Sequence, residues 1–163
     1  MKKAAYMGMF LALALILSYV ETLIPIHFGI YGIKLGLTNA VVLWMLYTMK
    51  AKEAFLISVL RIFLVGFLFG NAFSIVYSLA GGTLSFLVMV LMKKTDKFKC
   101  ISVSVAGGIS HNIGQLVIAA CIMETTALLY YIPVLIAAGA VMGLLIGIIS
   151  QELILRLNSW KFF

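Results

Sequence analysis

The chain has 163 residues, of which 64% are hydrophobic and 10% are charged, and its formal net charge is +7. Soluble domains are about 45–50% apolar and about 25% charged, and a fold of this size could not bury the excess apolar surface. The composition therefore excludes a water-soluble protein and predicts an integral membrane protein.

Apolar runs of about 20 residues follow one another along the chain, and each can cross a hydrocarbon core about 30 Å thick. The run after Lys2 and Lys3 lacks a small-residue cleavage site, so we expect a retained helix and not a signal peptide. Turn or charge signals separate the runs. The pattern predicts an all-α polytopic membrane protein, one transmembrane domain over residues 1–163, with a bundle of six transmembrane helices at residues 4–20, 35–49, 53–70, 72–92, 101–123 and 127–155.

Basic residues mark one side of this six-helix topology. On that side are Lys2, Lys3, Lys50, Lys52, Lys93, Lys94, Lys97, Lys99, Arg156 and Lys161, whereas the opposite loops hold only Lys34. Because loops rich in Lys and Arg stay in the cytoplasm, we expect a multi-pass protein of the cell membrane with both termini cytoplasmic. The basic residues are scattered over separate loops without interleaved aromatic residues, so nucleic acid is not an expected partner.

Strongly polar residues lie inside four of the predicted helices. The second helix has Lys34 at its outer edge and Asn39 deeper, and the third carries Arg61 part of the way across. The fourth helix has one polar face made of Asn71, Ser74, Ser78, Gly81, Gly82 and Ser85. The fifth, around "GISHNIGQ", has a polar sector about 100° wide made of Ser104, Gly108, His111, Asn112, Gln115 and Ala119.

These polar residues need partners, because a charged side chain at the centre of a membrane costs roughly 3 kcal/mol by insertion scales. Close helix packing is enough to explain the serines and glycines alone. Packing rarely requires a cation and an imidazole together, so we favour a polar cavity that is accessible to a ligand. The predicted ligand-binding residues are Lys34, Asn39, Arg61, Asn71, Ser74, Ser78, His111, Asn112 and Gln115.

Two features of the predicted outer side each allow two interpretations. Residues 21–34, which include Glu21 and His27, form the longest external segment. This segment could fold over the mouth of a pocket, or it could be an ordinary interfacial loop. Tyr130 and Tyr131 fit an interfacial aromatic belt better than they fit ligand contacts.

Small residues recur at four-residue spacing on two helices. The first helix has Ala4, Gly8 and Ala12, and the sixth has Gly139, Gly143 and Gly147. This spacing aligns small residues on one helix face, where two backbones can approach closely. Packing within the protein explains both stripes, but the stripe on the first helix could instead dock a membrane partner.

Four motifs in order, "GIKLGLTN", "RIFLVGFLFGN", "SLAGGTLSFLVM" and "GGISHNIGQL", span nearly the whole chain. They resemble the family called heptaprenyl diphosphate synthase component I, or the Gx transporter family. That family in turn resembles the substrate-binding S-components of energy-coupling-factor transporters, which have six helices, cytoplasmic termini and a ligand pocket that opens outward. The resemblance implies an S-component-like fold, with the charged, imidazole and amide residues named above near the ligand. It also implies that Ala4, Gly8 and Ala12 dock the coupling protein.

We therefore expect the substrate-binding membrane subunit of an energy-coupling-factor type importer, which captures a small vitamin-like, flavin-like or isoprenoid-precursor ligand from outside. The expected partners are this small molecule, membrane lipid, a coupling transmembrane protein and ATPase subunits. Arg61, Lys34 and His111 indicate an anionic or hydrogen-bond-rich ligand. The alternative is a non-catalytic membrane component of heptaprenyl or polyprenyl diphosphate synthesis, in isoprenoid or quinone metabolism.

We do not expect this chain to be an enzyme. Prenyl transfer needs a divalent metal ion held by clustered carboxylates, but Asp96 is the only aspartate and the four glutamates are isolated at helix edges. The sequence has no Walker A loop, so any use of ATP must come from a partner. No catalytic residue, metal site or cofactor is predicted, and the spacing of Cys100 and Cys121 suggests no disulfide.

Overall fold

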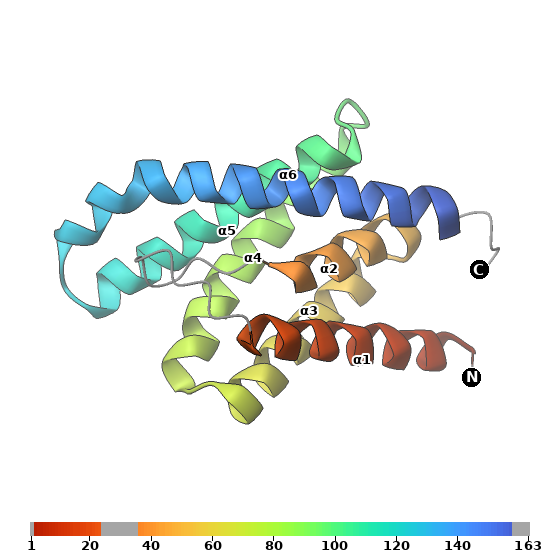
Figure 1. Cartoon of the computed structure of the whole chain (residues 1–163), viewed down its shortest axis with the longest axis horizontal. Helices are drawn as coiled ribbons and strands as arrows, with labels where there is room; N and C mark the ends of the chain where they lie inside the picture. Colours follow the sequence, from red (N-terminus) through yellow and green to blue (C-terminus); the bar gives the residue numbers. More distant parts are fainter. Residues whose placement is uncertain (1, 24–35, 158–163) are drawn as a thin grey trace.

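The computed structural model describes residues 2–23 and 36–157 (Figure 1). Its elements are α1 (Lys2–Leu23), α2 (Leu37–Thr48), α3 (Ala51–Phe69), α4 (Ala72–Lys94), α5 (Cys100–Ile122), the 3₁₀ helix η1 (Thr126–Tyr131) and α6 (Ile132–Leu157). No strand occurs within these ranges. The all-α fold predicted from the sequence is confirmed.

Four segments are long and apolar enough to cross a membrane: α1, α4, α5 and the continuous stretch Thr126–Arg156, which joins η1 to α6. α3 has 19 residues but carries Lys52, Glu53 and Arg61. α2 has only 12 residues, so its length is about 18 Å, against a hydrocarbon core of about 30 Å. The helix predicted at 35–49 is present as α2 but is shorter than predicted.

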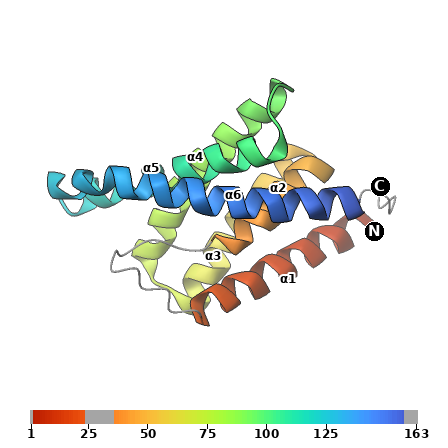
Figure 2. The ribbon, with the colours of Figure 1, turned by 45° about the horizontal axis from the view of Figure 1, so that its top comes forward.

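α2 lies in the interior of the bundle, between α1, α3 and α6 (Figure 2). Seven of its twelve residues are buried, namely Thr38, Ala40, Val41, Val42, Leu43, Met45 and Leu46. A mostly apolar helix that is covered by other helices contacts mainly protein. α2 is therefore the centre of the hydrophobic core, and this position explains why it does not need the length of a membrane span.

α5 and α6 run side by side and meet through glycines (Figures 1 and 2). A Cβ atom added at Gly139 would lie 2.7 Å from the carbonyl oxygen of Gly108, and one at Gly108 would lie 2.3 Å from that of Gly139. Cβ atoms at Gly143 and Gly147 would lie 2.7 Å and 2.9 Å from Cα atoms of α5. The small-residue stripe of α6 therefore packs inside the protein.

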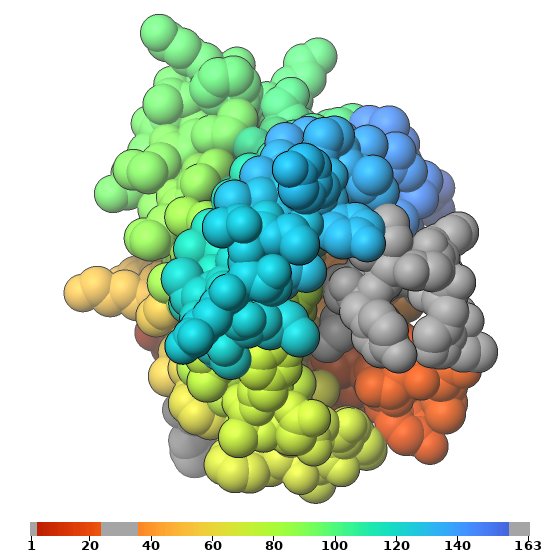
Figure 3. Space-filling view, turned by 90° about the vertical axis from the view of Figure 1, so that its left-hand side faces the viewer, coloured from red at the N-terminus to blue at the C-terminus, as the bar shows by residue number. Residues whose placement is uncertain are grey.

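The start of α1 and the end of α6 lie at the same end of the bundle (Figure 1). Lys3 forms an ion pair of 2.5 Å with Glu53 at the start of α3, and Lys93 Nζ donates to the Leu46 carbonyl, 2.5 Å away, near the end of α2. These contacts bring basic residues from α1 and α4 to the end of the bundle where α3 begins and α2 ends. Figure 3 views the opposite end, on which the end of α5, η1, the α3–α4 turn and the end of α1 are visible.

Candidate functional site

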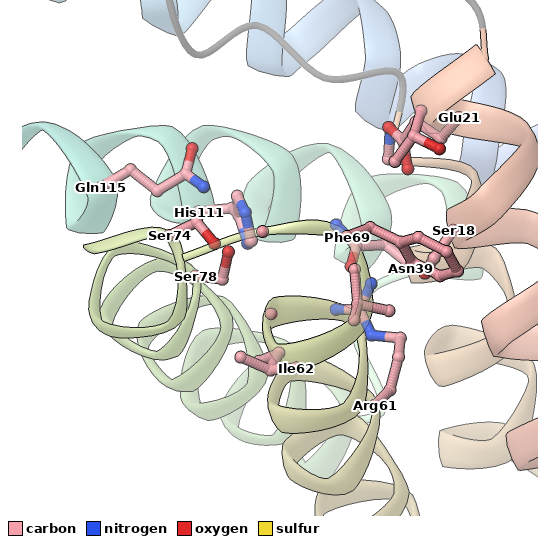
Figure 4. Close-up of a pocket in the computed structure, with 15 residues that line it drawn as sticks. Ser18, Glu21, Asn39, Arg61, Ile62, Phe69, Ser74, Ser78, His111 and Gln115 are labelled. Carbon is pink, nitrogen blue, oxygen red and sulfur yellow. The ribbon is translucent and has the colours of Figure 1, made fainter. Parts of the chain in front are cut away.

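A cavity of about 220 Å³ lies among α1, α2, α3, α4 and α5 (Figure 4). Its polar lining comes from Ser18, Glu21, Thr22, Asn39, Arg61, Ser74, Ser78, His111 and Gln115. Ile62, Val65, Gly66, Phe69 and Gly70 supply much of the remaining wall. The cavity therefore combines charged, amide, hydroxyl and imidazole groups with an apolar side, which is the usual composition of a small-molecule site.

The cavity occupies the half of the bundle opposite the chain ends. Its lining residues come from the end of α1, the start of α2, the second half of α3, the start of α4 and the second half of α5. The basic residues at the starts of α1 and α3 and at the end of α4 belong to the other half. The site and the basic end are thus separated along the length of the bundle.

Arg61 is the only basic side chain of the cavity lining that the structure describes, setting His111 aside. Its guanidinium points into the cavity (Figure 4). Among the described residues, Nε of Arg61 is buried without a hydrogen-bond partner, and the side chain is in no direct salt bridge. A buried cation is costly unless a charge or a hydrogen-bond acceptor compensates it. The cavity therefore presents a donor group suited to an anion.

Glu21 contributes the negative charge of the cavity wall. It lies close enough to Arg61 for the two opposite charges to attract each other electrostatically. Its carboxylate also accepts a hydrogen bond from the backbone N–H of Gly36. Gly36 precedes α2 with φ of 69°, a left-handed conformation that favours glycine. Glu21 therefore ties the end of α1 to the start of α2 at the edge of the cavity.

Ser18 and Glu21 were not among the predicted ligand-binding residues. The signal was present, because residues three apart lie on the same face of a helix. Ser18 also links α1 to α2 directly, since its hydroxyl lies 2.9 Å from that of Thr38, a fully buried residue. The sequence does not show that this face of α1 meets α3, because that contact joins segments about 40 residues apart.

Asn71 does not line the cavity, although it was predicted to do so. It caps α4: its Oδ1 accepts from the N–H of Ser74 at 2.8 Å, and its own N–H donates to the Ser74 hydroxyl at 3.2 Å. Asparagine is a preferred capping residue because its side chain satisfies free N–H groups in the first turn. Ser74 itself lines the cavity, with Ser78 one turn further along α4.

The polar residues of α5 divide between two neighbours. His111 and Gln115 line the cavity next to α4, whereas Asn112 turns to α6 and donates from Nδ2 to the Leu135 carbonyl at 2.8 Å. Successive residues of a helix are rotated by about 100°, so Asn112 points away from the cavity. The predicted single polar face is therefore corrected: α5 lies between α4 and α6, and its polar sector serves both.

Gln115 is 3% exposed and its side chain reaches into the cavity (Figure 4). Within the described part of the chain, its amide makes no hydrogen bond. The glycine at position 81 makes room for this side chain, since a Cβ there would lie 2.6 Å from Cγ of Gln115. A buried amide without a protein partner is a group that a ligand or water would satisfy.

The other predicted residues lie elsewhere. Lys34, together with most of the external segment 21–34, falls outside the described residues. Ala4, Gly8 and Ala12 are all exposed on α1, and a Cβ at Gly8 would meet nothing within 4 Å.

Tyr130 and Tyr131 are exposed, and neither lines the cavity. In the ranges that the structure describes, no group of three or more His, Cys, Asp or Glu residues comes together.

The fold and the site together define a polytopic helical membrane protein with a polar cavity in one half of its bundle. The family model of heptaprenyl diphosphate synthase component I matches residues 10–153. The chain belongs to this family. Searches of the curated proteins and of the solved structures found no match.

Proposed function

We propose that this protein is the substrate-binding membrane subunit of an energy-coupling-factor type importer and that it captures a small ligand from outside the cell. The observation that supports this function most is the polar cavity around Arg61. A helix bundle built only for stability would not place a guanidinium with a buried, unpaired Nε on the wall of a cavity beside an amide that makes no hydrogen bond to the described residues, because both groups are costly without a partner.

The size of the cavity favours a small ligand. Its volume of about 220 Å³ is below the range of about 300–1,000 Å³ that is usual for sites of drug-sized molecules. A long polyprenyl chain would not fit, and such a chain would also leave Arg61 and Gln115 without partners. A vitamin-like molecule or a short precursor with polar groups fits both the volume and the lining.

The position of the cavity supports uptake from outside. The cavity lies in the half of the bundle away from the basic residues of α1, α3 and α4. Because positively charged ends stay in the cytoplasm, this half faces the exterior and both termini are cytoplasmic in a cell-membrane protein. Ligand would then enter from the outer side and be released after a coupling step.

The outer face of α1 suits the coupling partner. Ala4, Gly8 and Ala12 are exposed at four-residue spacing, so the backbone of a second membrane helix could approach closely. The chain has no phosphate-binding loop, and ATPase subunits would therefore supply the energy through a coupling transmembrane protein. In this proposal α1 contacts the coupling protein and the cavity holds the ligand.

A second function is favoured by the family to which the chain belongs, whose description names a component of heptaprenyl diphosphate synthase. The chain would then be a non-catalytic membrane component associated with polyprenyl diphosphate synthesis. We infer that the chain itself is not an enzyme in either case. Asp96 is the only aspartate, and it lies in the α4–α5 turn and not in the cavity.

Native mass spectrometry of the detergent-solubilised protein tests the proposed binding function. We expect a retained small molecule on the wild-type protein and its loss from Arg61→Gln. The matched control is Leu60→Gln on the same helix, since Leu60 is 40% exposed and lies outside the cavity lining. Retention of the same molecule by Arg61→Gln would show that the cavity is not its binding site.

Co-purification distinguishes the two functions. An importer subunit should bring down a coupling membrane protein with a pair of ATPase subunits, and Gly8→Leu should remove them. Recovery of a soluble prenyl diphosphate synthase in their place would support the second function.

A further inference from the structure

The cavity has two chemically different ends (Figure 4). Arg61, Glu21, Asn39 and Ser18 lie at one end, whereas His111, Gln115, Ser74 and Ser78 lie at the other. The first end carries two formal charges of opposite sign. The second end carries an amide, an imidazole and two hydroxyls, so it is rich in hydrogen-bonding groups.

Among the described lining residues, the charged end balances one positive charge against one negative charge. Arg61 supplies the positive charge, and Glu21 supplies the negative charge within electrostatic range of it. A ligand with one negative charge can share the guanidinium with Glu21, because the five N–H donors of arginine form a planar fork. A diphosphate would bring several negative charges to the one arginine that the described lining provides, and it would also meet repulsion from Glu21. The balance of charges therefore favours a monoanion over a polyanion.

The uncharged end requires a partner with both donors and acceptors. The Gln115 amide can donate two hydrogen bonds and accept two, and it has no hydrogen bond to the described part of the chain. The capping interactions of Ser74 already use its hydroxyl, both as acceptor and as donor. The Gln115 amide therefore offers both donors and acceptors at this end, which an amide or imide edge would complement.

We infer that the cavity takes a small ligand with a single net negative charge, whose anionic group meets Arg61 and whose opposite edge is an uncharged amide or imide that pairs with Gln115. This inference rests on the proposed binding function and names the class of its ligand. It excludes phosphorylated isoprenoid precursors, which carry too many negative charges and have no amide edge.

Three probes of different charge test the inference on the full-length protein in detergent. They are orotate, which carries one carboxylate and an imide edge, its neutral carboxamide, and isopentenyl diphosphate as a polyanion. Each probe is titrated while the thermal unfolding midpoint of the protein is followed. The measurement is the probe concentration that gives half of the maximal rise in this midpoint. We expect orotate to act at a concentration at least tenfold lower than either of the other two.

Two variants assign the two ends. Arg61→Gln should raise the half-saturating concentration of orotate by about ten- to a hundredfold, which is the range expected for the loss of a charge-assisted hydrogen bond. Gln115→Leu should reduce the preference for orotate over benzoate, a monoanion without an imide edge. Leu60→Gln should leave all the half-saturating concentrations unchanged, since this side chain lies outside the cavity lining.

Glu21→Gln isolates the effect of the negative charge, because glutamine can still accept the hydrogen bond from Gly36. We expect this variant to lower the ratio of the half-saturating concentration of isopentenyl diphosphate to that of orotate by about tenfold. An unchanged preference would show that Glu21 does not select against polyanions.

The inference is overturned if isopentenyl diphosphate or the neutral carboxamide stabilises the wild-type protein as well as orotate does, or if none of the three does so. Native mass spectrometry separates this result from failure of the proposed function. A retained neutral or polyanionic molecule would leave the binding function intact and overturn only the ligand class. If no molecule is retained and no probe stabilises the protein, the binding function is rejected as well.

Discussion

α1 and α6 carry the same kind of small-residue stripe but use it differently. On α6, Gly139 meets Gly108 of α5 so closely that no Cβ could be added at either position without displacing backbone. On α1, Gly8 faces outward and a Cβ would meet nothing within 4 Å. Four-residue spacing of small residues therefore predicts a flat helix face, while the neighbouring helices determine whether that face is covered.

Gly139→Val should have the largest effect on stability. The added Cβ would lie 2.7 Å from the Gly108 carbonyl oxygen, and the contact involves backbone that cannot rotate away. We expect a loss of about 3 kcal/mol or more, at the upper end of the cost of overpacking. The measurement is the yield of monodisperse protein and its thermal unfolding midpoint. Near wild-type behaviour would mean that α5 and α6 do not pack as the structure shows.

Asn112→Ala should have a smaller effect on the same interface. It removes the hydrogen bond of 2.8 Å from Nδ2 to the Leu135 carbonyl, which contributes about 1 kcal/mol. For a protein of this size we expect the unfolding midpoint to fall by about 2–4 °C. The binding of orotate should not change, because Asn112 lies outside the cavity. A loss of binding with unchanged stability would place Asn112 in the site after all.

Lys3→Ala tests how α1 is held. Lys3 pairs with Glu53; the Lys3 side chain is 63% exposed and that of Glu53 is 13% exposed. Water and salt reach the Lys3 ammonium and screen the pair, which therefore contributes little. We expect a change in the free energy of unfolding below about 0.5 kcal/mol, measured by thermal unfolding at low and high salt. Arg156→Ala, which removes the exposed pair with Glu152, is the matched control. A drop of several degrees would show that this pair anchors α1.

Gly8→Leu should have the smallest effect on stability, since the position is open and surface substitutions usually stay within about 0.5 kcal/mol. The expected change is in association, because a large side chain would hold a second helix away from this face. Co-purification of the coupling protein should be lost in Gly8→Leu and kept in Gly8→Ala. Equal recovery from both variants would exclude this face of α1 as the docking surface.

Much of the fold could be predicted from the sequence because helices in a membrane satisfy their own backbone hydrogen bonds. Long apolar runs therefore predict helices directly, and six helices appear at the expected places along the chain. α2 is the exception in length. Its apolar sequence is as typical of a buried core helix as of a short membrane span, and the covering by α1, α3 and α6 determines which of the two it is.

The candidate site could be predicted only in part. Arg61, His111 and Gln115 stood out because strongly polar groups inside apolar runs need a partner, and all three line the cavity. Asn71 has the same polarity but is used as a helix cap. Glu21 was not selected because its distance in sequence from Arg61 hides the contact between the end of α1 and α3.

Three properties could be predicted from the amino-acid sequence without any coordinates. They are the helical membrane fold, the gathering of basic residues at one end, and the polar face along α5. These properties follow from composition and from the rotation of about 100° per residue within one helix. Three others became visible only in the folded bundle: α5 divides its polar face between α4 and α6, Glu21 joins the cavity, and the described residues leave the stripe on α1 uncovered. The reason is that each of these properties depends on which helices become neighbours. The packing of the whole bundle decides that, and the periodicity of a single helix does not.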